Sequence, residues 1–218
     1  FFSSPSRLGR LFLSMWRDGS LFLHVGITLT ETLVSFALVV VIGLAVSLLL
    51  WLSDSVFQVL EPYLVILNSL PKSALAPLLI VWLGANSRTI IVAGMSVAIF
   101  GTILNLYTGF TETSREKIRL IYTLHGTKKD ALTKVVLPST VPMIISIMKV
   151  NIGLCLVGVV IGEFIGARNG LGYLIIYGSQ VFQLDLVILS ILILCLMAML
   201  LYGGVTAAEK LYHRRQHA

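Results

Sequence analysis

Long apolar runs without charge dominate this sequence and restrict what it can fold into. Residues 24–53 carry one acidic residue, Glu31, in their first third and no charge after it. An uncharged apolar stretch of about 20 residues matches the thickness of the hydrocarbon core of a bilayer. Because only 12% of all residues are charged and the mean hydropathy is +0.95, a polytopic membrane protein is predicted.

Four further segments are apolar enough to cross a bilayer, which predicts an all-α membrane helix bundle of about five transmembrane helices. Residues 54–84 contain Pro62, Pro71 and Pro77, so this span is expected to be bent or interrupted. Spans and loops leave no room for a separate globular domain, and residues 1–218 are expected to form a single transmembrane domain. The other three spans are expected at residues 86–110, 139–166 and 184–204.

The first 20 residues are mixed in character and are not expected to span the membrane. The stretch "SRLGRLFLSMW" places arginines and apolar residues at helical spacing, which is typical of an amphipathic helix on the membrane surface. No cleavable signal is expected, because the chain opens with aromatic and small residues instead of a basic start followed by an apolar core.

A polar insertion, residues 111–138, interrupts the apolar pattern. It is expected to form two short helices, residues 115–125 and 127–137, separated at Gly126 and closed by Pro138. The second helix is amphipathic, and its apolar arc fits either lipid headgroups or a groove on a soluble partner. The apolar arc consists of Ala131, Leu132, Val135 and Val136, and the polar arc of Asp130, Thr133 and Lys134.

The distribution of basic residues predicts how the chain is oriented. Cytoplasmic loops are enriched in Lys and Arg, and the loops assigned to the opposite side hold only Arg88 and Arg168. The insertion and the C-terminus are therefore expected in the cytoplasm, with residue 1 outside. This topology accounts for the net charge of +6, so no nucleic-acid partner is expected. The basic residues of the insertion and the tail are Arg115, Lys117, Arg119, Lys128, Lys129, Lys134, Lys210, Arg214 and Arg215.

Polar residues inside the spans are candidates for a solute pathway, because a charge at the centre of a bilayer costs about 2.5–3.5 kcal/mol on insertion scales. Each charged candidate also has a structural alternative: pairing near the helix break for Lys72, snorkelling for Lys149, and a bond to the following turn for Glu163. Lys149 and Glu163 are about 21 Å apart along a helix and cannot pair. The candidates are Lys72, Lys149, Asn151 and Glu163.

The insertion resembles the coupling loop of bacterial binding-protein-dependent ABC importer permeases, with Gly126, a basic amphipathic segment and a closing Leu137 and Pro138. The stretches "LPKSALAPLLIVWLGANSRTIIVAGMSVAIFGTILNLYTGF" and "GEFIGARNGLGYLI" are similar to the nitrate, sulfonate, taurine and pyrimidine-precursor subgroup. Two departures stand out. The Glu-Ala-Ala of the family loop is replaced by residues 120–122, Leu-Ile-Tyr, and the resemblance begins after the first of the six spans usual in relatives, so that span is not expected within these residues.

The resemblance implies a permease subunit that forms the solute pathway and is coupled to ATP hydrolysis by partner subunits. It implies as partners a second copy of the chain in a homodimer, two cytoplasmic ATPase subunits and an external solute-binding protein. The location implied is the bacterial cytoplasmic membrane, with lipid around the spans. The coupling segment carried over by resemblance consists of Tyr122, Thr123, Leu124, His125, Gly126, Thr127, Lys128, Lys129, Asp130 and Ala131, closed by Leu137 and Pro138.

No enzymatic activity, bound cofactor or metal is expected of this chain. The stretch "HGTKKDALT" lacks the glycine spacing of a Walker A loop, so ATP and Mg²⁺ are expected in the partner ATPases. Cys155 and Cys195 lie in apolar runs with no Cys or His at metal-ligand spacing. The alternatives kept open are a non-transporting membrane scaffold and an intramembrane enzyme.

Overall fold

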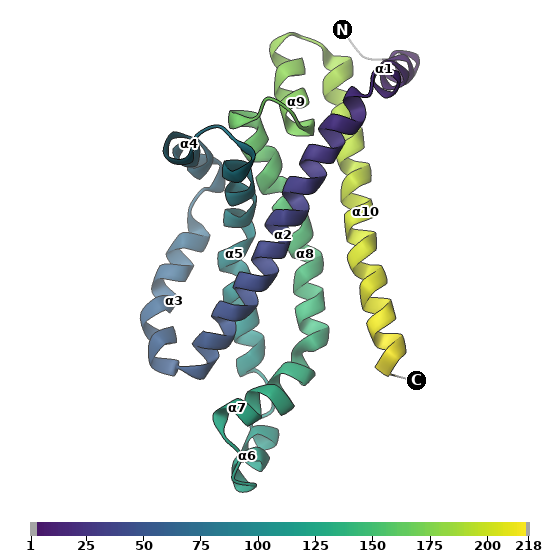
Figure 1. Ribbon diagram of the computed structural model, residues 1–218. Helices are drawn as coiled ribbons and strands as arrows, with labels where there is room; N and C mark the ends of the chain where they lie inside the picture. Colours follow the sequence, from purple (N-terminus) through teal and green to yellow (C-terminus); the bar gives the residue numbers. More distant parts are fainter. Residues whose placement is uncertain (1–3, 217–218) are drawn as a thin grey trace.

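The computed structural model describes residues 4–216, and side chains from residue 4 to residue 210. Every regular element in this part of the chain is helical, which confirms the predicted fold class (Figure 1). The elements are α1 (Pro5–Arg17), α2 (Ser20–Leu52), α3 (Asp54–Ser69), α4 (Lys72–Leu83), α5 (Ser87–Thr111), α6 (Arg115–Thr123), α7 (Lys128–Ala131), the π-helical segment η1 (Leu132–Val136), α8 (Leu137–Gly166), α9 (Leu171–Gln180) and α10 (Leu184–Gln216).

The predicted interruption of the second span is confirmed. Among the described residues, four helices are long and apolar enough to cross a membrane, and α3 and α4 make a fifth if they count as one bent span. These two helices meet at 96° across Leu70 and Pro71. A residue before proline is pushed away from helical geometry, and Leu70 is extended, with ψ 139°. Pro62 and Pro77 lie inside α3 and α4 and do not end them.

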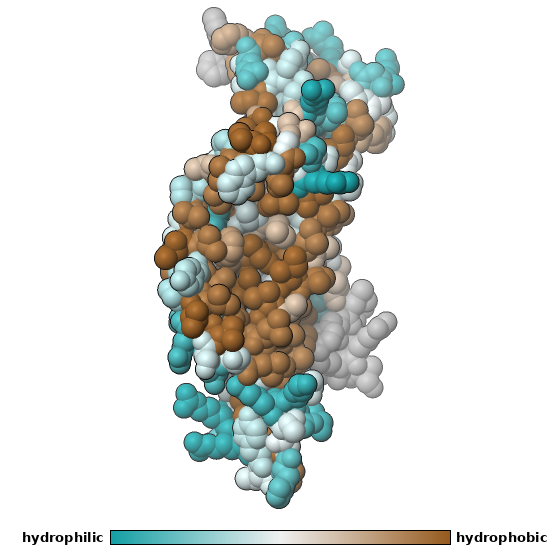
Figure 2. All heavy atoms as spheres, turned by 60° about the vertical axis from the view of Figure 1, so that its left-hand side comes forward, coloured by the Kyte–Doolittle hydropathy of each residue, from teal (hydrophilic) through white to brown (hydrophobic). Residues whose placement is uncertain are grey.

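Helices α2, α5 and α8 form the centre of the bundle, with α3 and α4 on one side and α10 on the other (Figure 1). The backbones of α5 and α8 touch, because a Cβ built on Gly158 would lie 2.8 Å from Cα of Gly94. Small residues allow such close contact between helices in lipid. Figure 2 shows a broad hydrophobic band between hydrophilic upper and lower ends, as expected of a membrane-spanning surface.

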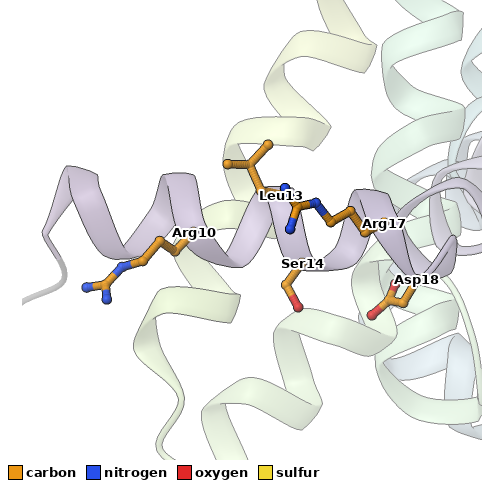
Figure 3. A pocket seen from close by; sticks show the side chains of 5 residues that line it. All are labelled: Arg10, Leu13, Ser14, Arg17 and Asp18. Carbon is orange, nitrogen blue, oxygen red and sulfur yellow. The ribbon is translucent and has the colours of Figure 1, made fainter.

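Helix α1 lies at the upper end of the molecule, beside α2 and α10 (Figure 1). Met15 is buried against the bundle, whereas Phe12 and Trp16 are exposed. The polar face borders a hollow of about 540 Å³ lined by Arg10, Leu13, Ser14, Arg17 and Asp18 (Figure 3). Hydrogen bonds from the hydroxyl and backbone N–H of Ser20 lower the pKa of Asp18. The predicted amphipathic character of this segment is confirmed.

Helix α9 was not predicted from the sequence, which led us to expect only a turn after Glu163. It folds back beside α8 and α10, and its Leu171 and Leu174 are buried. Gly170, just before it, has φ 113°, a conformation that side chains with a Cβ rarely adopt. The turn is therefore real, and it leads into a short helix that packs into the bundle.

The polar insertion contains α6 and α7, and α7 continues through η1 into α8. Pro138 therefore does not end the second helix, contrary to the prediction. The N–H of Leu137 donates to the carbonyl of Leu132, five residues back, so the turn is wider than an α-helical one. Pro138 then occupies the first turn of α8, where its missing N–H costs little.

Candidate functional site

The apolar arc of the polar insertion packs against the chain's own helices. Ala131 and Val136 are fully buried in a cluster that includes Phe110 of α5 and Trp51 of α2. Neither lipid headgroups nor the groove of a partner therefore covers this arc. Periodicity showed which face is apolar, but the residues that bury it are distant in the sequence.

The tip of the insertion, by contrast, exposes apolar side chains. The exposed fractions are 60% for Leu120, 46% for Tyr122 and 71% for Leu124. Leu120 and Tyr122 stand where the family has its Glu-Ala-Ala, so the departure from the family pattern adds apolar surface at the tip.

The break between α6 and α7 depends on close packing at Gly126. His125, not Gly126, has the positive φ, 60°. A Cβ on Gly126 would lie 2.5 Å from Cγ2 of Ile121 and 2.9 Å from its carbonyl oxygen. Glycine is required here by the approach of α6, and not by its own φ angle.

A capping box begins α7. The carboxylate of Asp130 accepts hydrogen bonds from the N–H and the hydroxyl of Thr127, at 2.9 and 2.6 Å, and the Asp130 N–H donates to the Thr127 hydroxyl at 3.3 Å. These bonds, and then the ammonium of Lys134 at 3.0 Å, hold the pKa of Asp130 below its usual range. The start of the second helix is therefore fixed locally.

Lys128 ties α7 to the junction of α2 and α3. Its ammonium lies 3.5 Å from a carboxylate oxygen of Asp54 and 5.5 Å from the ring centre of Trp51. Lys129 is exposed, as is Pro138. The residues of the predicted coupling segment thus form one continuous unit that is fixed to the bundle on one side and exposed on the other.

Lys72 and Lys149 both have partners within the chain. The ammonium of Lys72 donates to the carbonyl of Leu67 at 2.6 Å and lies 5.1 Å above the ring centre of Phe100. The Leu67 carbonyl lies in the last turn of α3, where carbonyls have no N–H partner within the helix, and the ammonium supplies that partner. The ammonium of Lys149 forms an ion pair with Glu209 of α10.

Asn151 lies on the opposite side of α8 from Lys149 and lines a cavity. Its side-chain N–H₂ donates to the hydroxyl of Thr102 at 2.8 Å, and it is only 3% exposed. A cavity of about 320 Å³ opens here between the end of α3, α5 and α8. We call it the amide cavity; it is lined by Asn68, Val97, Ala98, Gly101, Thr102, Asn105, Ser146, Ile147, Val150, Asn151 and Leu154.

Three residues that share this cavity with Asn151, namely Asn68, Asn105 and Ser146, were not predicted from the sequence. They are neutral, whereas the predicted candidates are mainly charged. A detectable signal did exist, because the lining residues of α5 and of α8 recur every three to four positions. The four predicted pathway residues themselves do not converge on one place.

Glu163 lies at the upper end of α8 and binds the start of α9. It is fully buried, and its two oxygens accept hydrogen bonds from the Thr28 hydroxyl and the Gly172 N–H, both at 2.6 Å. The Thr28 hydroxyl accepts the Leu171 N–H at 2.8 Å, and Nδ1 of His24 accepts the Gly170 N–H at 3.0 Å. We call these contacts the α9 anchor. The structural alternative considered for Glu163, a bond to the following turn, is what the structure shows.

Three buried polar residues of α2 at this end were not among the predicted site residues, namely His24, Thr28 and Glu31. Glu31 is 3% exposed and lies beside Glu163 and Ser87. The position of Glu31 in the sequence did not indicate this cluster, because a single acidic residue in a span does not show which residues of other helices lie beside it. Among the described residues, no group of three or more His, Cys, Asp or Glu side chains could hold a metal ion.

Comparison with known proteins identifies the family. Residues 37–216 match the family described as binding-protein-dependent transport system inner membrane component. The chain is 32% identical over 191 residues to a probable ABC transporter permease protein of Haemophilus influenzae, covering 88% of this chain and 77% of the relative. It is 29% identical to the formylaminopyrimidine transport permease protein of Halalkalibacterium halodurans, covering 87% and 76%.

More distant relatives agree with this assignment. The taurine transport system permease protein of Escherichia coli is 25% identical, over 88% of this chain and 70% of the relative. The fold matches a chain of the methionine ABC transporter MetNI in an inward-facing conformation, with a TM-score of 0.72 at 20% identity, covering 85% of this chain and 92% of that one. This chain therefore belongs to the binding-protein-dependent transport system inner membrane component family and is a transmembrane permease subunit of an ABC importer.

Proposed function

We propose that the amide cavity is part of the route by which solute crosses the membrane, between two copies of this chain. The observation that carries the proposal is the gathering of five polar side chains within the spanning helices on an open face, namely Asn68, Thr102, Asn105, Ser146 and Asn151. Apolar side chains of α8 next to them are exposed, including Val150 at 62% and Val157 at 53%. A second copy in a homodimer would cover this apolar surface and enclose the polar strip.

The polar insertion couples this route to ATP hydrolysis in two separate ATPase subunits. Its inner arc is held by the bundle, so a force on the exposed tip is transmitted to the base of α2, α5 and α8. The exposed apolar side chains of Leu120, Tyr122 and Leu124 supply the contact surface. ATP and Mg²⁺ bind in those subunits, and this chain binds no cofactor of its own.

The same arrangement supports one orientation in a bacterial cytoplasmic membrane, with the insertion on the inner side. The insertion and the last turns of α10 lie toward the same end of the bundle in Figure 1 and carry most of the basic residues. The positive-inside rule places that end in the cytoplasm, although Arg7, Arg10 and Arg17 of α1 lie at the other end. An external solute-binding protein then docks at the end that carries α1 and α9.

Cysteine labelling of the assembled importer tests the route. Asn105→Cys is the better probe, because Asn105 is exposed in the amide cavity whereas Asn151 is buried against Thr102. Its reaction with a small hydrophilic thiol reagent should be measurable and should change when ATP is added, because alternating access opens the route to one side at a time.

The matched control is Leu192→Cys on α10, an exposed apolar position that faces lipid in this arrangement. It should stay unreactive with and without ATP. If Asn105→Cys also stays unreactive in both states, the amide cavity is not part of the route, and a non-transporting role for this face becomes the better explanation.

A further inference from the structure

We infer that the transported solute is a neutral polar molecule with both hydrogen-bond donors and acceptors, and not an anion. The inference rests on the proposed function of the amide cavity as the route. The relatives of this chain are named for solutes of both kinds, since nitrate and aliphatic sulfonate permeases occur beside formylaminopyrimidine and riboflavin permeases. The cavity itself distinguishes the two classes.

Every polar side chain that lines the amide cavity is an amide or a hydroxyl. The side chains of Asn68, Asn105 and Ser146 make no hydrogen bond with any other described residue. Each of them offers both donors and acceptors to a molecule in the cavity. Asn151 uses its N–H₂ on Thr102, which leaves its carbonyl oxygen as an acceptor. The chemistry on offer is hydrogen bonding without charge.

Two lysines of the spanning region, Lys72 and Lys149, have partners of their own. Lys149 leaves α8 on the side of α10, where Glu209 neutralises its charge in an ion pair. Lys72 is held by the Leu67 carbonyl and lies over the Phe100 ring. Neither lysine lines the cavity. An anion in the cavity would therefore meet no unpaired cation among the described residues of its lining.

Charge decides which solute such a route tolerates. An anion that leaves water for a low-dielectric space loses solvation that a cation replaces best, and the lining offers no cation, only two uncommitted side-chain amides on different helices. A neutral polar molecule loses only hydrogen bonds, which amides and hydroxyls can replace one for one. The volume of about 320 Å³ is at the lower end of the range for small-molecule sites and fits a small organic solute.

Thiol reagents of different charge test this inference even while the solute is unidentified. The assembled importer would carry Asn105→Cys in a background with Cys155→Ala and Cys195→Ala. It would be treated with methanethiosulfonates that bear a neutral hydroxyethyl, an anionic sulfonatoethyl or a cationic trimethylammonioethyl group. Each rate is divided by the rate of the same reagent with a free thiol in water. The neutral reagent should exceed the anionic one by about tenfold or more, because only the anion loses charge solvation.

A variant distinguishes the possible roles of Lys72. Lys72→Gln in the same background should change the anionic rate less than about twofold, because the ammonium does not line the cavity. If the anionic reagent matches or exceeds the neutral one, or if Lys72→Gln slows it strongly, the route is built for anions and the inference is overturned while the proposed route stands. If no reagent reacts, the proposed route itself is wrong.

Discussion

The two ends of α8 are held in opposite ways. At the upper end, the α9 anchor joins α2, α8 and α9 through buried hydrogen bonds centred on Glu163. At the lower end, the polar insertion is held by apolar packing around Phe110 and Val136, and its own tip stays exposed. Buried hydrogen bonds depend on particular atoms, whereas apolar packing depends on shape. The upper end should therefore respond to changes of chemistry and the lower end to changes of volume.

The largest effect on stability is expected at the α9 anchor. Glu163→Leu removes both acceptors, so the buried Gly172 N–H loses its partner and the Thr28 hydroxyl keeps only its longer bond to the His24 carbonyl, at 3.2 Å. Unpaired buried polar groups of this kind cost about 1–3 kcal/mol each, so a loss of about 3 kcal/mol is expected. Thermal unfolding of the purified chain in detergent would measure it.

Glu163→Gln is the matched control, because the amide keeps an acceptor and nearly the same volume. It should cost about 1 kcal/mol, the typical net value of one hydrogen bond. Equal stability of Glu163→Leu and wild type would show that the anchor does not hold α9, and that the two ends do not differ in the way described.

At the lower end, a change of volume should be decisive. Gly126→Val forces a side chain into the space occupied by Ile121, and overpacking of this kind costs about 1–3 kcal/mol. Because the break between α6 and α7 must shift, solute uptake should be abolished and the ATPase of the assembled importer should run without transport. Membrane insertion should stay intact.

Gly203→Val provides the comparison, since a Cβ there meets no atom within 4 Å. This variant should transport as wild type does. Wild-type uptake by Gly126→Val would remove the reason for assigning a coupling role to the insertion.

The smallest effect on stability, and a large one on assembly, is expected at the tip. Leu124 is 71% exposed, so Leu124→Ser should change the free energy of unfolding by less than about 0.5 kcal/mol. Removing an apolar anchor from an interface should nevertheless weaken ATPase binding by about tenfold or more. Val181→Ser, an exposed apolar position after α9, should leave ATPase binding unchanged. Co-purification of the ATPase subunit would check both, and equal yields from the two variants would place the contact elsewhere.

Much of the architecture was predictable from local features. Uncharged runs marked the spans, and Pro71 marked the break between α3 and α4, because proline disfavours helix at the residue before it. Amphipathic spacing marked α1 and the apolar arc of the insertion. The prediction that Pro138 ends a helix was wrong, because the wide turn before it absorbs the missing hydrogen bond.

The site was less predictable, and α8 shows why. Lys149 and Asn151 were grouped as candidates for one pathway. Residues two apart on a helix are rotated by about 200° around its axis, so their side chains point to nearly opposite sides. One reaches Glu209 on α10, and the other reaches Thr102 on α5. A span with polar residues on several sides does not reveal which side faces a neighbour, which faces lipid and which faces a cavity.

The sequence by itself determined what the bilayer requires: apolar length, the place of the break and the end of the bundle that carries the basic insertion. The tertiary structure decided which polar groups meet, because hydrogen bonds such as that between Thr28 and Glu163 join residues 135 positions apart. Transfer into lipid depends on the composition of each segment by itself, so it can be recognised in the sequence. A buried polar group instead depends on a hydrogen-bond partner that can lie anywhere in the chain. That is why the spans could be predicted, but not the α9 anchor or the amide cavity.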